Sequence, residues 1–523
     1  MRKKKILCCI LIFGILLCLL SACKSAEEEQ SSESIPSSSP ADDTPLEGTE
    51  GALKVAVFAS KGSQSDGYRV RETIQGPSYS IGPYWMGTEF VYKSLIEDFS
   101  EQTGIPVEIE YSNYVTWIHS DADVLIIDTT RYTPTEMLSE EYCYDLTPFF
   151  EEYGIYSNGL YIEPVLRAGQ VEDKQLVFPL TFNMSVLMGS EESLARSNLS
   201  IKEGMTYEEL LDTFIGAWGS LPIVEDRTVP LMDQTDWTWS DASIGPYRFF
   251  ANAGGLCYDE ASPSEDGKEK IMLDQLLKAT EKFLYADLAV EESEIVKACK
   301  ETFGLYTLFM DHSQSYRMSE IIYEFSPEDW GSKVGCIASG TGANEYYPFA
   351  TQALYYEHAY EEMGETFFCM GMPKYGTSDQ YRASVVSYGI VPAKSKQPHN
   401  AYKLLQFLAE ADRPVYYDMS VNRECIAEMF DQLTQRKIEI VVETTEDMTL
   451  KEVGPLSEES RDKLMDLIDH IEEAYFPDRS IDRRVYEILE KYFGGSLSSS
   501  SEVYDRIATY KASLMPKEKV EYN

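Results

Sequence analysis

The sequence predicts an α/β protein with a mostly parallel sheet, and three observations near the start of the chain support this fold class. The alternating run 53–58 predicts a strand, and apolar residues at helical spacing over 90–99 predict a helix that ends at Gly104. Residues 107–111 and the nearly continuous apolar run 123–129 predict two further strands, the second buried on both faces. This order of elements indicates an α/β unit with parallel strands.

Length and composition indicate a folded body with more than one domain. At 523 residues the chain is too long for one simple core, so we expect two or more domains. Hydrophobic residues make up 43% of the chain, which is typical of a globular protein and not of a disordered one.

The rest of the chain alternates between extended and helical patterns. Residues 177–188 and 383–391 predict extended segments, and Thr206 with Glu209 forms a capping box that opens a helix. We interpret 326–380, the least regular stretch, as holding an insertion, although 333–338 within it predicts a strand. One apolar stripe predicts a helix after Pro398: Ala401, Leu404, Leu405 and Leu408. Three further stripes predict a helical C-terminal end: Leu464, Ile468, Ile471 and Tyr475; Val485, Ile488, Leu489 and Tyr492; Val503, Ile507, Tyr510 and Leu514.

Residues 1–22 have the pattern of a secretory signal, with a basic start at 2–5 and an apolar run over 6–20. That run is shorter than the ~20 residues that a membrane-spanning helix needs. Leu20-Ser21-Ala22-Cys23 resembles the lipobox of bacterial lipoproteins, which implies cleavage before Cys23 and diacylation of its sulfur. The alternative is an uncleaved anchor helix with a chance cysteine. In either case we expect the chain to be anchored on the extracytoplasmic side of the cell membrane.

A tether is predicted between the lipid site and the folded body. Residues 23–50 would form this lipidated, flexible tether, because they are rich in Ser, Glu and Pro and have almost no large apolar side chains. Such a segment cannot bury enough surface to fold.

The charge of the chain excludes one class of partner. The mature chain would carry 41 cations and 88 anions, a net charge of -47, so it should repel nucleic acid. Six mature cysteines besides Cys23 show no C-x-x-C pair, so no zinc or redox motif is visible, and their disulfide state stays open: Cys143, Cys257, Cys299, Cys336, Cys369 and Cys425.

The search for catalytic motifs returns nothing specific. The chain has no G-x-S-x-G, H-E-x-x-H or G-x-x-x-x-G-K-[ST] motif, and its five histidines lack metal-ligand spacing. With 88 carboxylates, no glycosidase pair can be singled out. We therefore expect no enzymatic activity, no cofactor and no metal.

Several short phrases occur in an order that is similar to one known family. Together with the lipobox, they resemble the family-1 extracellular solute-binding proteins, which are lipoprotein receptors of ABC importers related to maltose-binding protein. The phrases are FSEQTGIPVE at 99–108, ADVL at 122–125, DLTP at 145–148, FPLTFN at 178–183, TYEE at 206–209, GIVPA at 389–393 and VNRE at 421–424. The resemblance departs from the family in the long stretch 60–84 and in 326–380.

The resemblance implies a periplasmic-binding-protein-like fold of two α/β lobes, joined by two or three crossing segments and closing on a ligand by a hinge. Lobe one would comprise 51–180 and 388–445, and lobe two 184–382 and 450–523. The crossings would lie near 179–183, near 382–388 and within 440–455.

Ligands in open α/β sheets meet the carboxyl ends of the strands, and this rule, with the crossings, selects the candidate site. Trp237 and Trp239 lie two residues apart, so both would face one side of an extended loop, where flat rings suit sugars. Each candidate has a structural alternative, such as a core position for Trp85 or backbone hydrogen bonds for Asn183. The candidates are Ser60, Tyr84, Trp85, Asp128, Thr129, Asn183, Trp237, Trp239, Ser313 and Arg382.

These inferences converge on a lipid-anchored receptor that passes a small solute to the transmembrane subunits of an ABC permease, without chemistry. A carbohydrate is the expected solute, while a polyamine or an amino acid stays open, and we expect a monomer. The rival hypotheses are a surface polysaccharide hydrolase, and a sensor or adhesion module that is not coupled to transport.

Overall fold

The computed structural model describes part of the chain. Every described residue belongs to one compact unit, residues 50–523. The lipid site Cys23 and the tether lie outside the described residues. The described ranges are 51–58, 80–81, 88–111, 121–129, 141–184, 186–196, 200–206, 209–210, 212–213, 231–233, 309–311, 337–340, 349–362, 364–371, 381–411, 419–443, 448–477, 484–485, 487–489, 491–492 and 495–514.

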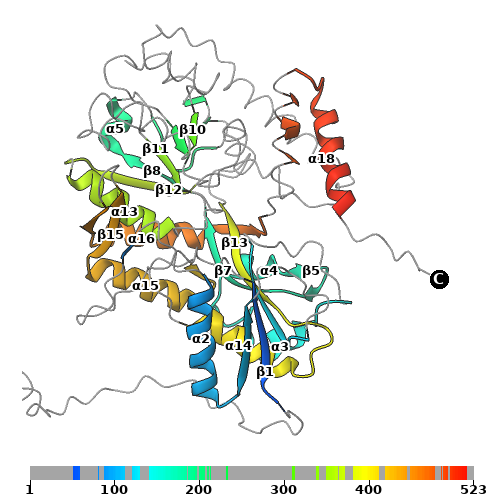
Figure 1. Cartoon of the computed structure of the whole chain (residues 1–523). Helices are drawn as coiled ribbons and strands as arrows, with labels where there is room; N and C mark the ends of the chain where they lie inside the picture. Colours follow the sequence, from blue (N-terminus) through cyan, green and yellow to red (C-terminus); the bar gives the residue numbers. More distant parts are fainter. Residues whose placement is uncertain are drawn as a thin grey trace, which may run out of the picture. The chain divides into compact units, whose positions relative to one another are not determined.

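The first sheet, as far as the chain is described, has seven strands in the order β14-β7-β13-β4-β1-β3, with β17 also paired to β13. Strand β1 pairs in parallel with β3 and with β4, which confirms the three strands predicted near the start of the chain. Strands β7 and β13 run antiparallel, side by side, at the centre (Figure 1). The strands are β1 (Leu53–Phe58), β3 (Val107–Tyr111), β4 (Val124–Asp128), β7 (Phe178–Met184), β13 (Tyr381–Ile390), β14 (Met419–Ser420) and β17 (Ile471–Tyr475).

Two helices, α2 (Thr88–Thr103) and α14 (Pro398–Glu410), pack against each other beside this sheet (Figure 1). The rings of Phe99 and Phe407 meet edge to face with centroids 5.5 Å apart. Helix α2 ends where predicted, because Gly104 takes a φ of 72°, which suits glycine at a helix C-terminus. The predicted apolar stripe of α14 is buried, so this helix supplies much of the core on its side.

The second sheet, within the described residues, has five strands in the order β10-β9-β11-β8-β12. The chain leaves the first sheet after β7, enters the second one residue later at β8, and returns between β12 and β13. Sheet membership therefore changes near two of the predicted crossings, while the lobe boundaries themselves stay a prediction. The strands are β8 (Val186–Ser190), β9 (Leu231–Asp233), β10 (Phe309–Asp311), β11 (Ile337–Gly340) and β12 (Phe367–Gly371).

The interpretation of 326–380 as an insertion is wrong for its described part. Strand β11 lies between β9 and β8 in the second sheet, and β12 forms its far edge. Helix α13 (Phe349–Glu362), which the sequence did not predict, contacts both β8 and β12. These elements build the sheet itself, because removing β11 would break its hydrogen-bonded order.

Short elements complete the described fold. The predicted capping box is confirmed, since Thr206 N donates to Glu209 Oε2 at 2.9 Å and Glu209 N donates to Thr206 Oγ1 at 3.3 Å. No described helix is long and apolar enough to cross a membrane. The remaining elements are β2 (Ser80–Ile81), α3 (Thr147–Glu152), α4 (Glu163–Arg167), β5 (Gln170–Val171), β6 (Lys174–Gln175), α5 (Glu191–Arg196), α15 (Arg423–Gln435), β15 (Ile438–Glu443), β16 (Met448–Val453), α16 (Glu458–Asp469) and α18 (Ser500–Leu514).

The predicted helical stripe that includes Tyr475 is wrong. Helix α16 ends at Asp469, and the next residues form β17, which pairs in parallel with β13. Apolar residues at 464, 468, 471 and 475 fit a helical period, but β13 offers an open edge to which the backbone of β17 bonds. The ladder begins where Tyr381 N donates to His470 O at 3.2 Å. Tertiary pairing therefore overrides the local pattern.

Candidate functional site

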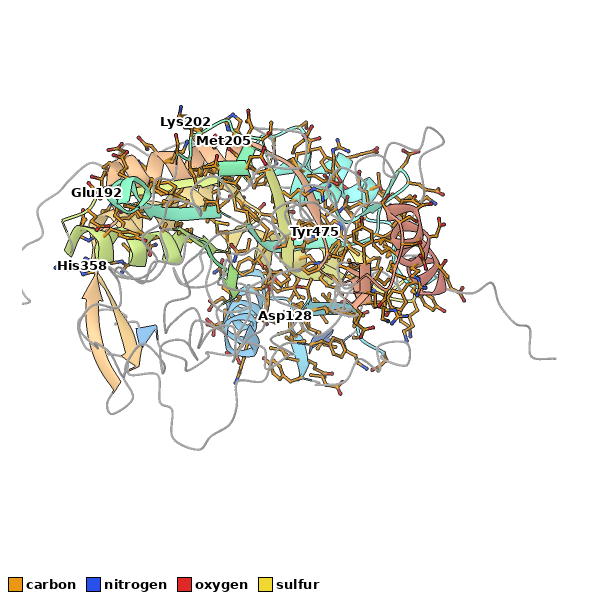
Figure 2. The ribbon with its side chains drawn as sticks, turned by 90° about the horizontal axis from the view of Figure 1, so that it is seen from above. Asp128, Glu192, Lys202, Met205, His358 and Tyr475 are labelled. Atoms are coloured by element: carbon orange, nitrogen blue, oxygen red, sulfur yellow. The ribbon has the colours of Figure 1, made fainter. Side chains whose placement is uncertain are left out.

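Two strands meet end to end on one edge of β13. Strand β4 runs antiparallel to β13, with Asp128 opposite Ser387. Strand β17 runs parallel to β13, with Tyr475 opposite Ser384. The carboxyl ends of β4 and β17 therefore point toward each other, and Figure 2 labels their last residues, Asp128 and Tyr475. Carboxyl ends at a change of strand direction are where α/β sheets bind ligands.

A bulge in β13 places two serines on one face of the sheet at this junction. Val385 pairs with Phe182 and Ser387 with Thr181, so Val386 is an extra residue relative to β7. Strict alternation would put Ser384 and Ser387 on opposite faces. With the bulge, Ser384 shares a face with Asn183, and Ser387 shares that same face with Thr181. We call this the polar face.

Three buried hydroxyl groups bond to one another on the polar face. The Oγ1 of Thr181 lies 2.5 Å from the Oγ of Ser387, and the hydroxyl of Tyr92 bonds to the same Ser387 oxygen. All three residues are 1% exposed. Tyr92 lies on helix α2, so its hydrogen bond to Ser387 ties this helix to the sheet. A serine at the centre can both donate and accept, which satisfies its neighbours without water.

Asp128 and Thr129 lie at the end of β4, as the sequence predicted. Both are nearly buried, at 5% and 7% exposure. The N–H and the hydroxyl of Thr129 both donate to the carbonyl oxygen of Val386, at 2.9 and 3.0 Å. This pair of hydrogen bonds fastens the end of β4 to the bulge in β13. Cross-strand pairing with Ser387 puts the Asp128 carboxylate on the polar face.

Asn183 supports the backbone where the chain leaves the first sheet. It is fully buried, and its Oδ1 accepts a hydrogen bond from Met184 N at 3.0 Å. Its carbonyl oxygen accepts from the hydroxyl of Ser384 at 3.3 Å. The sequence had left two roles open for Asn183, ligand contact or hydrogen bonding to the backbone, and these bonds are of the second kind. They stabilise the end of β7, just before the chain enters β8.

Arg382 forms an ion pair across the β13–β17 ladder. Its guanidinium nitrogen lies 3.1 Å from an Oε2 of Glu473, the residue directly opposite in the register. The Arg382 side chain is 10% exposed and that of Glu473 is 38% exposed. Each residue lies two positions before a member of the Ser384–Tyr475 pair, so the ion pair also lies on the polar face.

An aromatic contact just beyond β17 fixes the end of this strand against β13. Beyond the strand, the ring of Phe476 packs edge to face on Tyr388, with centroids 5.2 Å apart, and Tyr388 is itself opposite Ile127 of β4. This contact brings the end of β17 next to the end of β4. Aromatic pairs of this geometry contribute roughly 0.5–1.5 kcal/mol beyond burial.

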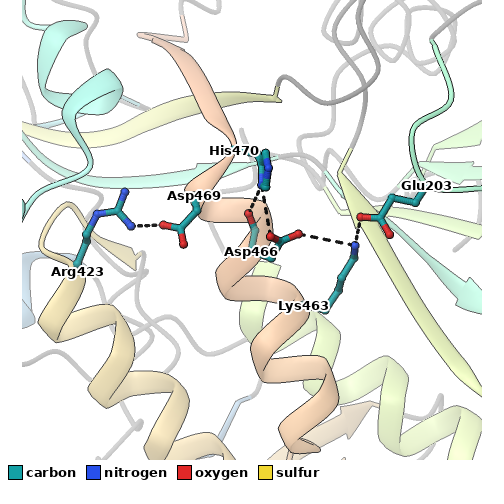
Figure 3. Close-up of polar contacts among 6 residues, drawn as sticks. All are labelled: Glu203, Arg423, Lys463, Asp466, Asp469 and His470. Carbon is teal, nitrogen blue, oxygen red and sulfur yellow. Dashed lines mark hydrogen bonds and ion pairs between the residues drawn. The ribbon is translucent and has the colours of Figure 1, made fainter.

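Charged groups hold the turn that precedes β17 (Figure 3). Arg423 at the start of α15 pairs with Asp469 at the end of α16, and Lys463 pairs with Glu203. Nδ1 of His470 lies 2.8 Å from the carbonyl oxygen of Asp466. Since these pairs are partly exposed to solvent, each contributes little free energy, but together they restrict where α16 ends.

The structure thus brings four of the predicted site residues onto three adjacent strands: Asp128 and Thr129 on or after β4, Asn183 on β7, and Arg382 on β13. Asp128 and Arg382 do not meet. Asp128 lies opposite Ser387, which is five residues, or roughly 15 Å, further along β13 than Arg382. The other predicted residues lie outside the described part of the chain: Ser60, Tyr84, Trp85, Trp237, Trp239 and Ser313.

Sequence reasoning missed five residues of the polar face, of which Thr181 lay in a predicted crossing segment but was not a candidate. Ser384 and Ser387 lay in a segment predicted to be extended, and their spacing of three gave no sign of a shared face. Glu473 and Tyr475 were assigned to a helix. Within the described residues, no group of three or more His, Cys, Asp or Glu residues could hold a metal ion. The hydroxyls of the polar face are buried and bonded to protein groups, whereas its carboxylates and the Tyr475 ring suit hydrogen bonding to, and packing on, a small solute.

Comparisons with known proteins support the fold. Searches of family models and of curated proteins return no match. Among solved structures, one similar chain is assigned as an oligosaccharide periplasmic-binding protein from Synechococcus sp. MITs9220. Its TM-score is 0.50 at 11% identity, over 88% of this chain and 99% of that one.

Two other solved structures give similar figures. A family-1 extracellular solute-binding protein from Alicyclobacillus acidocaldarius has a TM-score of 0.49 at 10% identity, over 90% of this chain and 100% of that one. The galacto-N-biose/lacto-N-biose I-binding protein of an ABC transporter from Bifidobacterium longum has a TM-score of 0.49 at 12% identity, over 90% and 98%.

The fold and the site together define a class. The chain has a mixed α/β fold of the periplasmic-binding-protein type, which confirms the fold class implied by the sequence resemblance. Proteins of this fold differ in what they bind, so the particular function must be argued from the polar face.

Proposed function

We propose that this protein is a lipid-anchored extracytoplasmic solute-binding protein of an ABC importer, and that it binds a small carbohydrate. The observation that carries the proposal is the polar face at the converging carboxyl ends of β4 and β17, where Asp128 and Tyr475 end their strands. A carboxylate accepts hydrogen bonds from sugar hydroxyls, and an aromatic ring packs on the apolar face of a sugar.

The fold neighbours support the same assignment. The Synechococcus protein with this fold carries the description of an oligosaccharide-binding protein. The lipobox-like sequence at Cys23 and the acidic tether at 24–50 fit a receptor that stays at the membrane while its body captures solute. The solute would be enclosed by hinge closure between two lobes and released to the transmembrane subunits of a permease. The receptor itself performs no chemistry.

Ligand-dependent melting tests the solute. The chain without its first 22 residues, with Cys23→Ser, would be heated with neutral mono- and oligosaccharides, polyamines and amino acids in turn. A ligand at 100 times its Kd adds about 2.7 kcal/mol to the free energy of unfolding, which shifts the melting temperature clearly. We expect a neutral sugar to give the largest shift. A shift with a polyamine or an amino acid alone would refute the carbohydrate assignment.

A separate experiment tests the anchor. Full-length protein expressed in a bacterial host with labelled palmitate should carry the label and sediment with membranes. Cys23→Ala should carry no label. An equal amount of label in the variant would exclude lipidation at Cys23.

A further inference from the structure

The cross-strand pair of Arg382 and Glu473 lies on the polar face. The two side chains lie directly opposite each other and 3.1 Å apart. In the next register position on the same face are Ser384 and Tyr475, about 7 Å further along the strands. The ion pair is therefore adjacent to the aromatic ring at which the proposed ligand would bind.

Three charged side chains are assigned to the polar face by the registers of the described strands: Asp128, Arg382 and Glu473. Two are carboxylates and one is a cation. The chain as a whole is strongly acidic, with a formal net charge of -43, so the surrounding field also favours cations. Without Arg382, the Glu473 carboxylate would lose this counterion within a negative field, which favours binding of an ammonium group; Asp128 lies roughly 15 Å away along β13 and adds to that field only at long range.

We infer that Arg382 is a specificity-determining positioning residue: it neutralises Glu473, and the polar face therefore selects an uncharged polyol and rejects cationic solutes. The inference rests on the proposed function, because it concerns the ligand of the same site. Arg382 acts through Glu473 and through the position of β17. Its side chain is 10% exposed, so the guanidinium is held in place and reaches its partner without a large entropic cost.

The pair gives opposite expectations for its two members. In Arg382→Gln, the Glu473 carboxylate loses its counterion and becomes a site for an ammonium group. In Glu473→Gln, the mostly buried guanidinium loses its carboxylate and becomes a site for a carboxylate on the ligand. The double variant removes both charges and should behave like the wild type toward charged probes.

The test uses calorimetric titration of the chain without its first 22 residues, carrying Cys23→Ser, with putrescine and with glucuronate. We expect Arg382→Gln to bind putrescine at least about tenfold more tightly than the wild type, and Glu473→Gln to do the same for glucuronate. Arg382→Lys keeps the positive charge and should keep the wild-type preference. Unchanged probe affinities in both single variants would overturn the inference.

Folding of the variants is checked separately, because removing one member of a partly buried ion pair destabilises a protein. If one single variant does not fold, the other one decides. Tighter binding of its own probe, putrescine for Arg382→Gln or glucuronate for Glu473→Gln, supports the inference, and an affinity equal to that of the wild type overturns it. Failure of the proposed function would give a different result: the wild type would bind no neutral sugar in the melting experiment.

Discussion

The hydroxyl oxygens of Thr181 and Ser387 lie 2.5 Å apart, although 206 positions separate the two residues in sequence. This contact joins β7 to the bulge of β13, and Tyr92 of α2 bonds to the same serine. The three groups form a closed set of hydrogen bonds directly behind the ends of β4 and β17. The polar face therefore has a rigid support that is independent of any ligand.

Ser387→Ala should lower the free energy of unfolding by about 2 kcal/mol, because two buried hydroxyls then lose a partner. Urea denaturation followed by circular dichroism measures the change. Thr181→Val removes one hydroxyl at similar volume and serves as the second arm of a double-mutant cycle. The two effects should not be additive, because both variants break the same network. Additive effects would show that the hydroxyls act independently.

The sequence predicted the strands around Asp128 well, because each strand is marked by a pattern within its own residues. Residues 53–58, 107–111 and 124–128 are apolar runs bounded by clear helix and turn signals, and a buried parallel strand has few alternatives. Asp128 follows from the same logic, since a polar residue that ends such a strand lies at the ligand edge. The order of elements then supplied the fold class.

The rest of the site depends on pairings that no local pattern encodes. Tyr475 sits at a helical position of an apolar stripe, yet its backbone pairs with β13, some ninety residues away in the chain. The bulge at Val386 reverses the alternation that would separate Ser384 from Ser387. A register shift is set by packing on both edges of β13, so it appears only once β4, β7 and β17 are in place.

Glu357 of α13 is a buried carboxylate that binds the start of α16. It accepts hydrogen bonds from Ser457 N at 3.0 Å, from Ser457 Oγ at 2.5 Å and from Ser460 Oγ at 2.7 Å. The N-terminus of a helix favours a negative charge, and Ser457 is also the N-cap of α16. Through α16, this carboxylate influences the placement of β17.

Glu357→Ala should therefore lower the free energy of unfolding by about 3 kcal/mol, since hydrogen bonds to charged groups contribute about 1.5–3 kcal/mol each. Glu361→Ala, an exposed site on the same helix, is the matched control and should change it by less than about 0.5 kcal/mol. Hydrogen exchange should also be faster in α16 of the Glu357 variant. Equal stability of the two variants would contradict this role.

His399 makes the protein sensitive to acid. Its ring packs edge to face on Phe149, with centroids 5.6 Å apart, and burial lowers its pKa below the ordinary value of 6.5, with the Lys403 charge acting in the same direction. The unfolded chain thus takes up a proton before the folded chain as the pH falls through 6.5. Stability is present above that value and is lost below it.

His399→Gln should remove this contribution, so the free energy of unfolding of the variant should fall less than that of the wild type between pH 7.5 and pH 5. Lys403→Gln should have a smaller effect in the same direction, because the positive charge beside His399 is gone. Urea denaturation at several pH values measures both slopes. Identical slopes in His399→Gln and wild type would exclude His399 as the titrating group.

Cys369 on β12 should be chemically inert in the folded protein, unlike Cys425 at the start of α15. Burial raises the pKa of the Cys369 thiol to about 12, so almost no reactive thiolate is present at pH 8. Cys425 is only partly buried.

Brief treatment of the folded protein with iodoacetamide, followed by peptide mass spectrometry, should label Cys369 about 100-fold more slowly than Cys425. In urea the two rates should become equal, which shows that the fold and not the local sequence protects the thiol. Comparable labelling of both in the folded state, or recovery of Cys369 in a disulfide, would contradict the buried free thiol.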